Sequence, residues 1–156
     1  MEIVSLIVVI AIACVVAALI AWRPLRRFSR QVQLERAREG FRLQRERLEA
    51  KFLQAAQATG KPRGLRWQQC HFESDVTFVR DKQTGEIAAL VGVTVHFEAI
   101  QGSDMEDNPN VSHPRSASAV FFFHKGHWNT VGKTVFNMSP IEALEHFKNQ
   151  YERAAS

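Results

Sequence analysis

The sequence predicts an α+β fold: an N-terminal transmembrane helix, a long arginine-rich helix, and a four-stranded antiparallel sheet with a C-terminal helix packed on it. Three observations lead to this fold class. Residues 3–22 form an uncharged run, and residues 25–59 favour helix. Beyond Gly64 the apolar residues recur with a period of two, which is typical of strands. We therefore expect an anchor over residues 1–23, a connecting helix over 24–60 and a small α+β domain over 61–156.

The apolar run 3–22 has the length of a membrane span. A helix of this length reaches about 30 Å, which is the thickness of a hydrocarbon core. Arg23, Arg26, Arg27 and Arg30 follow the run, and no Lys or Arg precedes it. Because basic residues favour the cytoplasmic side, we expect a single-pass protein of the cell membrane with its N-terminus outside and its soluble domain in the cytoplasm. The four arginines would then lie at the surface of the lipid bilayer.

The connecting helix should end at Gly60, just before Pro62. Within it apolar residues recur every seven positions, at Leu34, Phe41, Leu48 and Ala55. This spacing suits one edge of a coiled coil, whereas Arg38 and Arg45 occupy positions of the second edge that should be apolar. Three arrangements remain open: a helix packed on the sheet of its own domain, a self-pairing stalk, and a helix lying on a membrane surface.

The positive charge is concentrated in the arginine-rich stretch. Residues 23–51 carry ten Lys or Arg against four Glu, a net charge of +6, whereas residues 61–156 carry ten against eleven acidic residues, a net charge of −1. Anionic lipid is therefore a candidate partner of this helix. Interleaved glutamates and the lack of a recognition motif argue against nucleic acid. Cys14 in the anchor and Cys70 in the domain cannot meet, which excludes a disulfide framework.

Four strands are predicted for the C-terminal domain. Two long strands over residues 67–80 and 87–100 each place apolar side chains on one face, and a turn from Asp81 to Glu86 joins them into an antiparallel hairpin. Two further strands follow, over 116–124 and over 128–136, with a break or bulge near Gly132.

A final helix is predicted to begin at Ser139. Ser139 suits the N-cap, Pro140 the first helical position, and Glu142 completes a capping box. Apolar residues spaced for one helical face then continue to residue 152, at Ile141, Leu144, Phe147 and Tyr151. A helix, four strands and a helix give the outline of a cystatin-like or NTF2-like domain, a likeness of shape that carries no function.

The segment from His124 to Pro140, with the sequence HKGHWNTVGKTVFNMSP, resembles the ending of uncharacterised bacterial single-pass membrane proteins with a small β-rich C-terminal domain. The resemblance covers roughly the last 90 residues. It implies no activity, so no functional residue follows from it.

The polar face of the first hairpin holds the sharpest candidate site. If the two ends of the turn pair, His71 lies opposite His96, close enough to share a metal ion with Glu73 or Glu98 as a third ligand. A register shifted by two residues would instead pair each histidine with a glutamate. A solvated or partner-covered polar face is the expected outcome, and metal binding or acid–base chemistry is the alternative.

The expected function is that of a membrane-tethered cytoplasmic interaction or scaffold domain whose partner is a protein, a second copy included. The strand containing Phe121, Phe122 and Phe123 is the expected contact surface, because an exposed apolar strand must be covered. One alternative is a domain, an enzyme included, that binds a small ligand or a metal through the polar hairpin face. Another is an electrostatic binder of anionic lipid. No cofactor and no catalytic residue are assigned, since no nucleophile elbow or phosphate loop is present and a non-enzymatic role is favoured.

Overall fold

A computed structural model describes residues 2–155, without the side chains of residues 2–5, 9, 19 and 21–27. The first helix, α1, spans Glu2–Ala58. The chain divides into two compact units within this helix: one ends at Arg36 and the other is Ala37–Ala155. The first unit is the N-terminal part of α1, where the large apolar side chains described between Leu6 and Ile20 are exposed. The division falls inside the predicted connecting helix, so residues 37–58 belong to the C-terminal unit.

The predicted transmembrane anchor is wrong. Across the residues that the structure describes, no helix combines the length and the apolar character needed to cross a membrane. This finding also overturns the predicted location in the cell membrane, with the N-terminus outside and the domain in the cytoplasm. The run 3–22 is no separate element, because α1 continues from it without a break into the charged residues that follow. The side chains of Arg23, Arg26 and Arg27 lie outside the description, and Arg30 is exposed.

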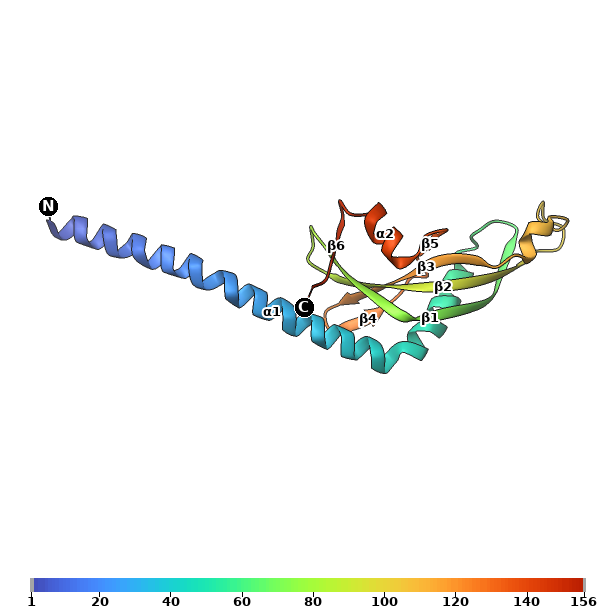
Figure 1. Ribbon diagram of the computed structural model, residues 1–156, viewed down its shortest axis with the longest axis horizontal. Coiled ribbons are helices and arrows are strands. Elements are labelled where there is room, and N and C mark those ends of the chain that lie inside the picture. The colour runs from blue at the N-terminus through green and yellow to red at the C-terminus, as the bar shows by residue number, and fades with distance from the viewer. Residues whose placement is uncertain (1, 156) are drawn as a thin grey trace. The chain divides into compact units, whose positions relative to one another are not determined.

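The second unit is built on an antiparallel sheet of six strands in the order β4-β3-β2-β1-β6, with β5 also pairing with β3 (Figure 1). The α+β class and the antiparallel sheet are confirmed, whereas the predicted number of four strands is wrong. The elements after α1 are β1 (Leu65–Asp81), β2 (Ile87–Ala99), the 3₁₀ helix η1 (Pro109–Ser112), β3 (Arg115–His124), β4 (His127–Asn129), β5 (Thr134–Phe136), α2 (Pro140–His146) and β6 (Tyr151–Arg153).

Two local features account for the extra strands. The predicted fourth strand divides into β4 and β5 because the chain turns at Gly132, whose φ is +72°. The final helix has the predicted capping box, in which Ser139 and Glu142 bond each other's main-chain N–H, but it stops at His146 instead of residue 152. The N–H of Tyr151 then bonds the carbonyl of Phe147, and the chain continues as β6 along β1.

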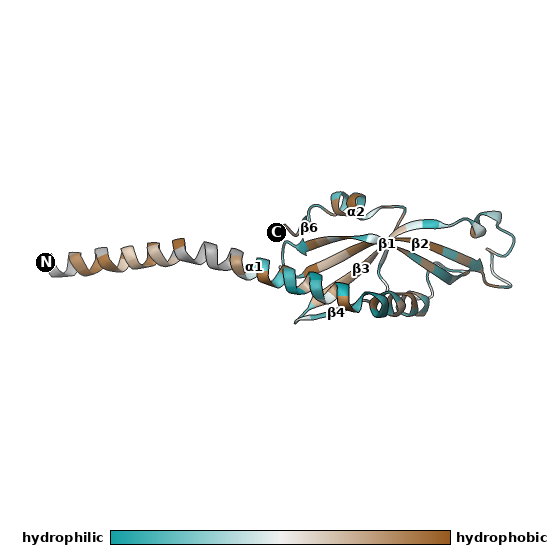
Figure 2. Cartoon of the chain, turned by 60° about the horizontal axis from the view of Figure 1, so that its bottom comes forward, coloured by the Kyte–Doolittle hydropathy of each residue, from teal (hydrophilic) through white to brown (hydrophobic). Residues whose placement is uncertain are grey.

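Residues 37–58 of α1 pack on one face of the sheet. The side chains of this segment buried below 5% exposure recur at helical spacing, at Ala37, Phe41, Leu48, Phe52 and Ala56. Phe41 lies 4.9 Å from Trp128 and 5.3 Å from Phe121 between ring centroids. Figure 2 shows hydrophobic and hydrophilic residues alternating around this part of the helix. Of the three arrangements left open, packing on the sheet is therefore observed here, and Phe41 and Leu48 are not available for a self-pairing stalk.

The short helix α2 covers part of the opposite face. Its Ala143 is 1% exposed and lies in a cluster with Val79, Leu90 and Val120 from the three central strands. Figure 1 shows α2 and residues 37–58 of α1 on opposite sides of the sheet. Because alternate residues of a strand share a face, the face under α2 continues along β2 to Thr94 and His96. The sheet is thus covered on one face by α1 and on part of the other by α2.

Candidate functional site

The polar sheet face, defined here by Gln69, His71, Glu73, Thr94, His96 and Glu98, lies on the same side of the sheet as α2. Neither of the two registers considered for it is observed. His71 pairs with Thr94, and His96 pairs with Gln69, so the two histidines are diagonal neighbours. Their rings still meet, with centroids 5.4 Å apart and planes at 88°. His71 is exposed and His96 is half-buried.

A bulge in β1 explains the register. Between Phe72 and Val76 the pairing shifts by two residues, so that Glu73, Ser74 and Asp75 lie opposite Gly92 alone. A shift by two residues leaves the side chains from Gln69 to Glu73 on their predicted faces and changes only their partners, whereas a further shift of one residue between Trp67 and Gln69 places Trp67 on the buried face. The alternation in the sequence therefore placed the histidines on the correct face, but it contained no signal for the bulge.

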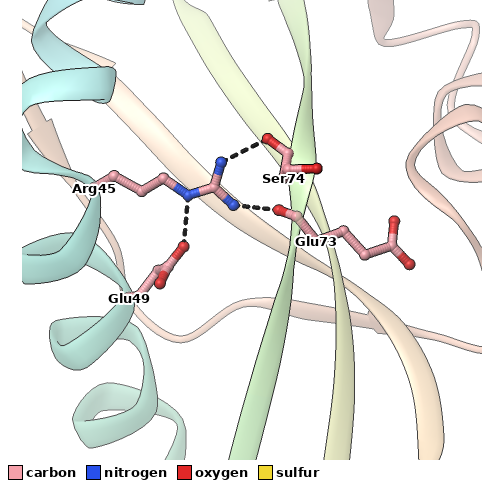
Figure 3. Close-up of polar contacts among 4 residues, drawn as sticks. All are labelled: Arg45, Glu49, Glu73 and Ser74. Atoms are coloured by element: carbon pink, nitrogen blue, oxygen red, sulfur yellow. Dashed lines mark hydrogen bonds and ion pairs between the residues drawn. The ribbon is translucent and has the colours of Figure 1, made fainter.

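Arg45 of α1 holds this bulge from the other face of the sheet. Its guanidinium donates hydrogen bonds to the main-chain carbonyls of Glu73 and Ser74, and its Nε lies 2.7 Å from the carboxylate of Glu49 (Figure 3). Figure 3 also shows the side chain of Glu73 pointing away from Arg45. That carboxylate lies across Gly92, since a Cβ on this glycine would be 2.2 Å from Oε2 of Glu73.

The three phenylalanines of β3 are not an exposed surface. Phe121 is fully buried against Phe41 and Phe52 of α1, and Phe123 is 8% exposed beside Trp128. Phe122 is half-buried and packs against the cluster under α2. The two faces of β3 are thus covered by two helices of the same unit, so these side chains do not supply the contact surface that the sequence suggested.

A cleft of about 420 Å³ lies beside the end of α1, where the β4–β5 loop packs against the helix. We call it the lysine cleft. Its lining residues are Thr59, Lys61, Trp67, Val131, Gly132, Lys133, Thr134 and Phe136. Trp67 and Phe136 form an aromatic cluster with Phe97, with centroid distances of 5.1 to 6.1 Å. Lys61 and Lys133 are exposed and are the charged residues of the lining.

The walls of the lysine cleft are held by hydrogen bonds. On one side, Nε1 of Trp67 donates to the carbonyl of Lys61 at 2.7 Å. On the other, Gly132 N donates to Oγ1 of Thr130 at 3.1 Å, and Oγ1 of Thr134 donates to the carbonyl of Gly132 at 3.0 Å. The loop therefore presents Val131, which is 64% exposed, from a fixed backbone.

Cys70 belongs to the core side of β1 and is not a reactive thiol. It pairs with Val95 and is half-buried. Burial raises its pKa to about 11, so that the thiol stays protonated near neutral pH. This environment supports its interpretation as a small apolar residue.

The lysine cleft and the polar sheet face are the distinctive features of the unit. No known protein family, curated protein or solved structure matches this chain. The function is therefore inferred from the chemistry of these two surfaces. Among the described residues, no three His, Cys, Asp or Glu side chains gather to hold a metal ion.

The lysine cleft was missed in the sequence because its residues come from three separate segments. A local signal existed for two of them: Thr59 and Lys61 lie at the predicted end of the connecting helix, and Val131 and Lys133 flank the glycine of the predicted break. Only the packing of the β4–β5 loop against α1 brings these residues together into one site.

Proposed function

We propose that the C-terminal unit is a binding domain whose lysine cleft takes a carboxylate that carries an aromatic or aliphatic group. The observation that supports this proposal is the composition of the cleft: an aromatic wall of Trp67 and Phe136 beside two lysines, with no acidic residue in the lining. Its volume of about 420 Å³ is in the range of small-ligand pockets.

Each part of such a ligand has a counterpart in the lining. The apolar group packs against the two aromatic rings and Val131, which removes apolar surface from water. The carboxylate lies near Lys61 and Lys133, and each ion pair at an exposed site contributes at most about 1 kcal/mol. Because the loop from Thr130 to Thr134 is already hydrogen-bonded, little ordering is needed when the ligand binds.

The binding test uses the purified full chain and a matched pair of probes. N-acetylphenylalanine and its amide have the same shape and differ in charge. Chemical shifts of Val131 to Thr134 should move with the acid, and the acid should bind more tightly than the amide. 3-Phenylpropionate, which has no peptide group, distinguishes a free organic acid from the end of a peptide. If neither acid moves these resonances, or if the amide binds equally well, the proposal is wrong.

Substitution of the two lysines tests whether their charges account for the tighter binding of the acid. We expect Lys61→Gln and Lys133→Gln each to weaken binding of the acid by about fivefold, which corresponds to about 1 kcal/mol, and to leave the amide unchanged. Lys51→Gln is the matched control, since Lys51 is exposed on α1 and does not line the cleft. Equal losses in all three variants would point to the net charge of the chain instead of the cleft.

A further inference from the structure

The two histidines of the polar sheet face are separated as two ligands of one metal ion would be. Metal–nitrogen distances of about 2.0–2.1 Å put each ring centre about 3.2 Å from the ion, so angles of about 90–120° at the ion separate the centres by about 4.5–5.5 Å. The observed separation of 5.4 Å between His71 and His96 lies in this range. The observed separation of the rings is therefore compatible with both histidines binding one ion.

The surroundings of the pair suit a cation. Glu73 is two residues from His71 along β1, Glu98 is two residues from His96 along β2, and both glutamates are exposed. Arg66 pairs with Glu98 across the strands, so the carboxylate of Glu73 is the negative charge of this face without a basic cross-strand neighbour, and it attracts a cation. The neighbouring Thr94, Gln69 and Ser116 are polar, and α2 packs over the other end of the face. The apolar cluster under α2 therefore does not block the access of an ion to the two histidines.

We propose that His71 and His96 bind a late first-row divalent cation, such as Ni²⁺, Zn²⁺ or Cu²⁺, as a two-histidine chelate completed by water. Imidazole is a preferred ligand of these ions, whereas Mg²⁺ and Ca²⁺ prefer oxygen. Two protein ligands leave coordination positions open. This site is on the polar sheet face, whereas the lysine cleft is lined by the segment after α1, by β1, by the β4–β5 loop and by β5. The metal site does not depend on whether the cleft binds a carboxylate.

The test is a calorimetric titration of the full chain with Ni²⁺ and with Zn²⁺. His71→Ala and His96→Ala should each weaken binding by about tenfold or more, because a chelate loses the benefit of its second ligand. The double variant should lose less affinity than the product of the two single losses, because each single loss already includes the benefit of chelation. His113→Ala, which removes an exposed histidine outside the pair, is the control and should leave the affinity unchanged.

A second measurement tests the native chain directly, so a variant that fails to fold leaves the proposal testable. Ni²⁺ is paramagnetic, and substoichiometric Ni²⁺ should broaden the ring proton resonances of His71 and His96 together, before those of the other four histidines. Equal broadening of all six histidines, or losses that are fully additive in the double variant, would show independent weak contacts and would overturn the proposal.

Discussion

Arg45 supplies hydrogen-bond donors to two main-chain carbonyls at the bulge of β1, those of Glu73 and Ser74. In a coiled coil its position would be apolar, and in this unit the same position faces the sheet. The side chain is 25% exposed, and its partner Glu49 is 24% exposed. Arg45, on the inner side of α1, therefore connects the helix to the larger of the two irregular stretches in the pairing of β1 with β2.

Arg45→Met should lower the free energy of unfolding by about 1–2 kcal/mol. Methionine keeps much of the length of the side chain but leaves the two carbonyls without their charged donor. Arg42→Met is the matched control, because Arg42 pairs with Glu39 on the exposed side of the same helix and should change stability by less than about 0.5 kcal/mol. Urea unfolding of both variants measures the difference, and equal effects would contradict the role given to Arg45.

At the scale of elements, the loop between β4 and β5 is fitted closely to the end of α1. Gly132 has a φ of +72°, and a Cβ there would lie 2.4 Å from the main-chain nitrogen of Ala56. Glycine is thus required both by the backbone conformation and by the space. This close approach brings Val131 and Lys133 next to Thr59 and Lys61, and so forms the lysine cleft.

Gly132→Ala should destabilise the unit by more than about 2 kcal/mol, since the loop must move away from the backbone of α1 in addition to the strain of a positive φ. Gly126→Ala separates the backbone strain of a positive φ from the steric clash with α1. Gly126 has a φ of +83° with nothing within 4 Å of a new Cβ, so only the backbone strain of about 1 kcal/mol applies. Thermal unfolding of the two variants checks this order, which a similar loss in both would contradict.

At the scale of the whole second unit, Asp81 connects the first hairpin to the C-terminal segment. Its carboxylate accepts hydrogen bonds from the main-chain N–H of Gln83 and Thr84 at 2.8 and 2.9 Å. It also accepts one from Nε2 of Gln150 at 3.2 Å. The main-chain N–H groups of Thr84 and Gln83 hold the pKa of Asp81 below its ordinary value of 3.8.

The stabilising effect of Asp81 should depend on pH. Because its pKa is lower in the folded chain, the ionised carboxylate stabilises the fold at pH values above 3.8, and this contribution is lost as the pH falls through the lower folded value. Asp81→Asn keeps an acceptor and removes the charge. The variant should be less stable than the native chain near about pH 7, and the difference should shrink below about pH 4. A difference that is the same at both pH values, measured by urea unfolding, would contradict this linkage.

Signals confined to neighbouring residues were reliable in this chain. The capping box at Ser139, the turn from Asp81 to Glu86 and the alternation along both long strands are all present in the structure. The final helix is shorter than predicted because Tyr151, which has the spacing of a helical face, joins the cluster under α2 from a strand. The composition of the run 3–22 suggested a separate helix, but in the structure this run is the N-terminal part of the longer helix α1.

The sequence by itself determined the class of the fold, the faces of the long strands and the start of the last helix, because these depend on residues a few positions apart. Only the tertiary structure decided that α1 packs on the sheet, that Arg45 bonds the bulge, and that His71 is diagonal to His96. The lysine cleft belongs to the second group, since Thr59, Trp67 and Lys133 meet only when the loop at Gly132 lies against α1. Contacts between distant residues depend on the exact register and packing, which no periodicity in the sequence encodes.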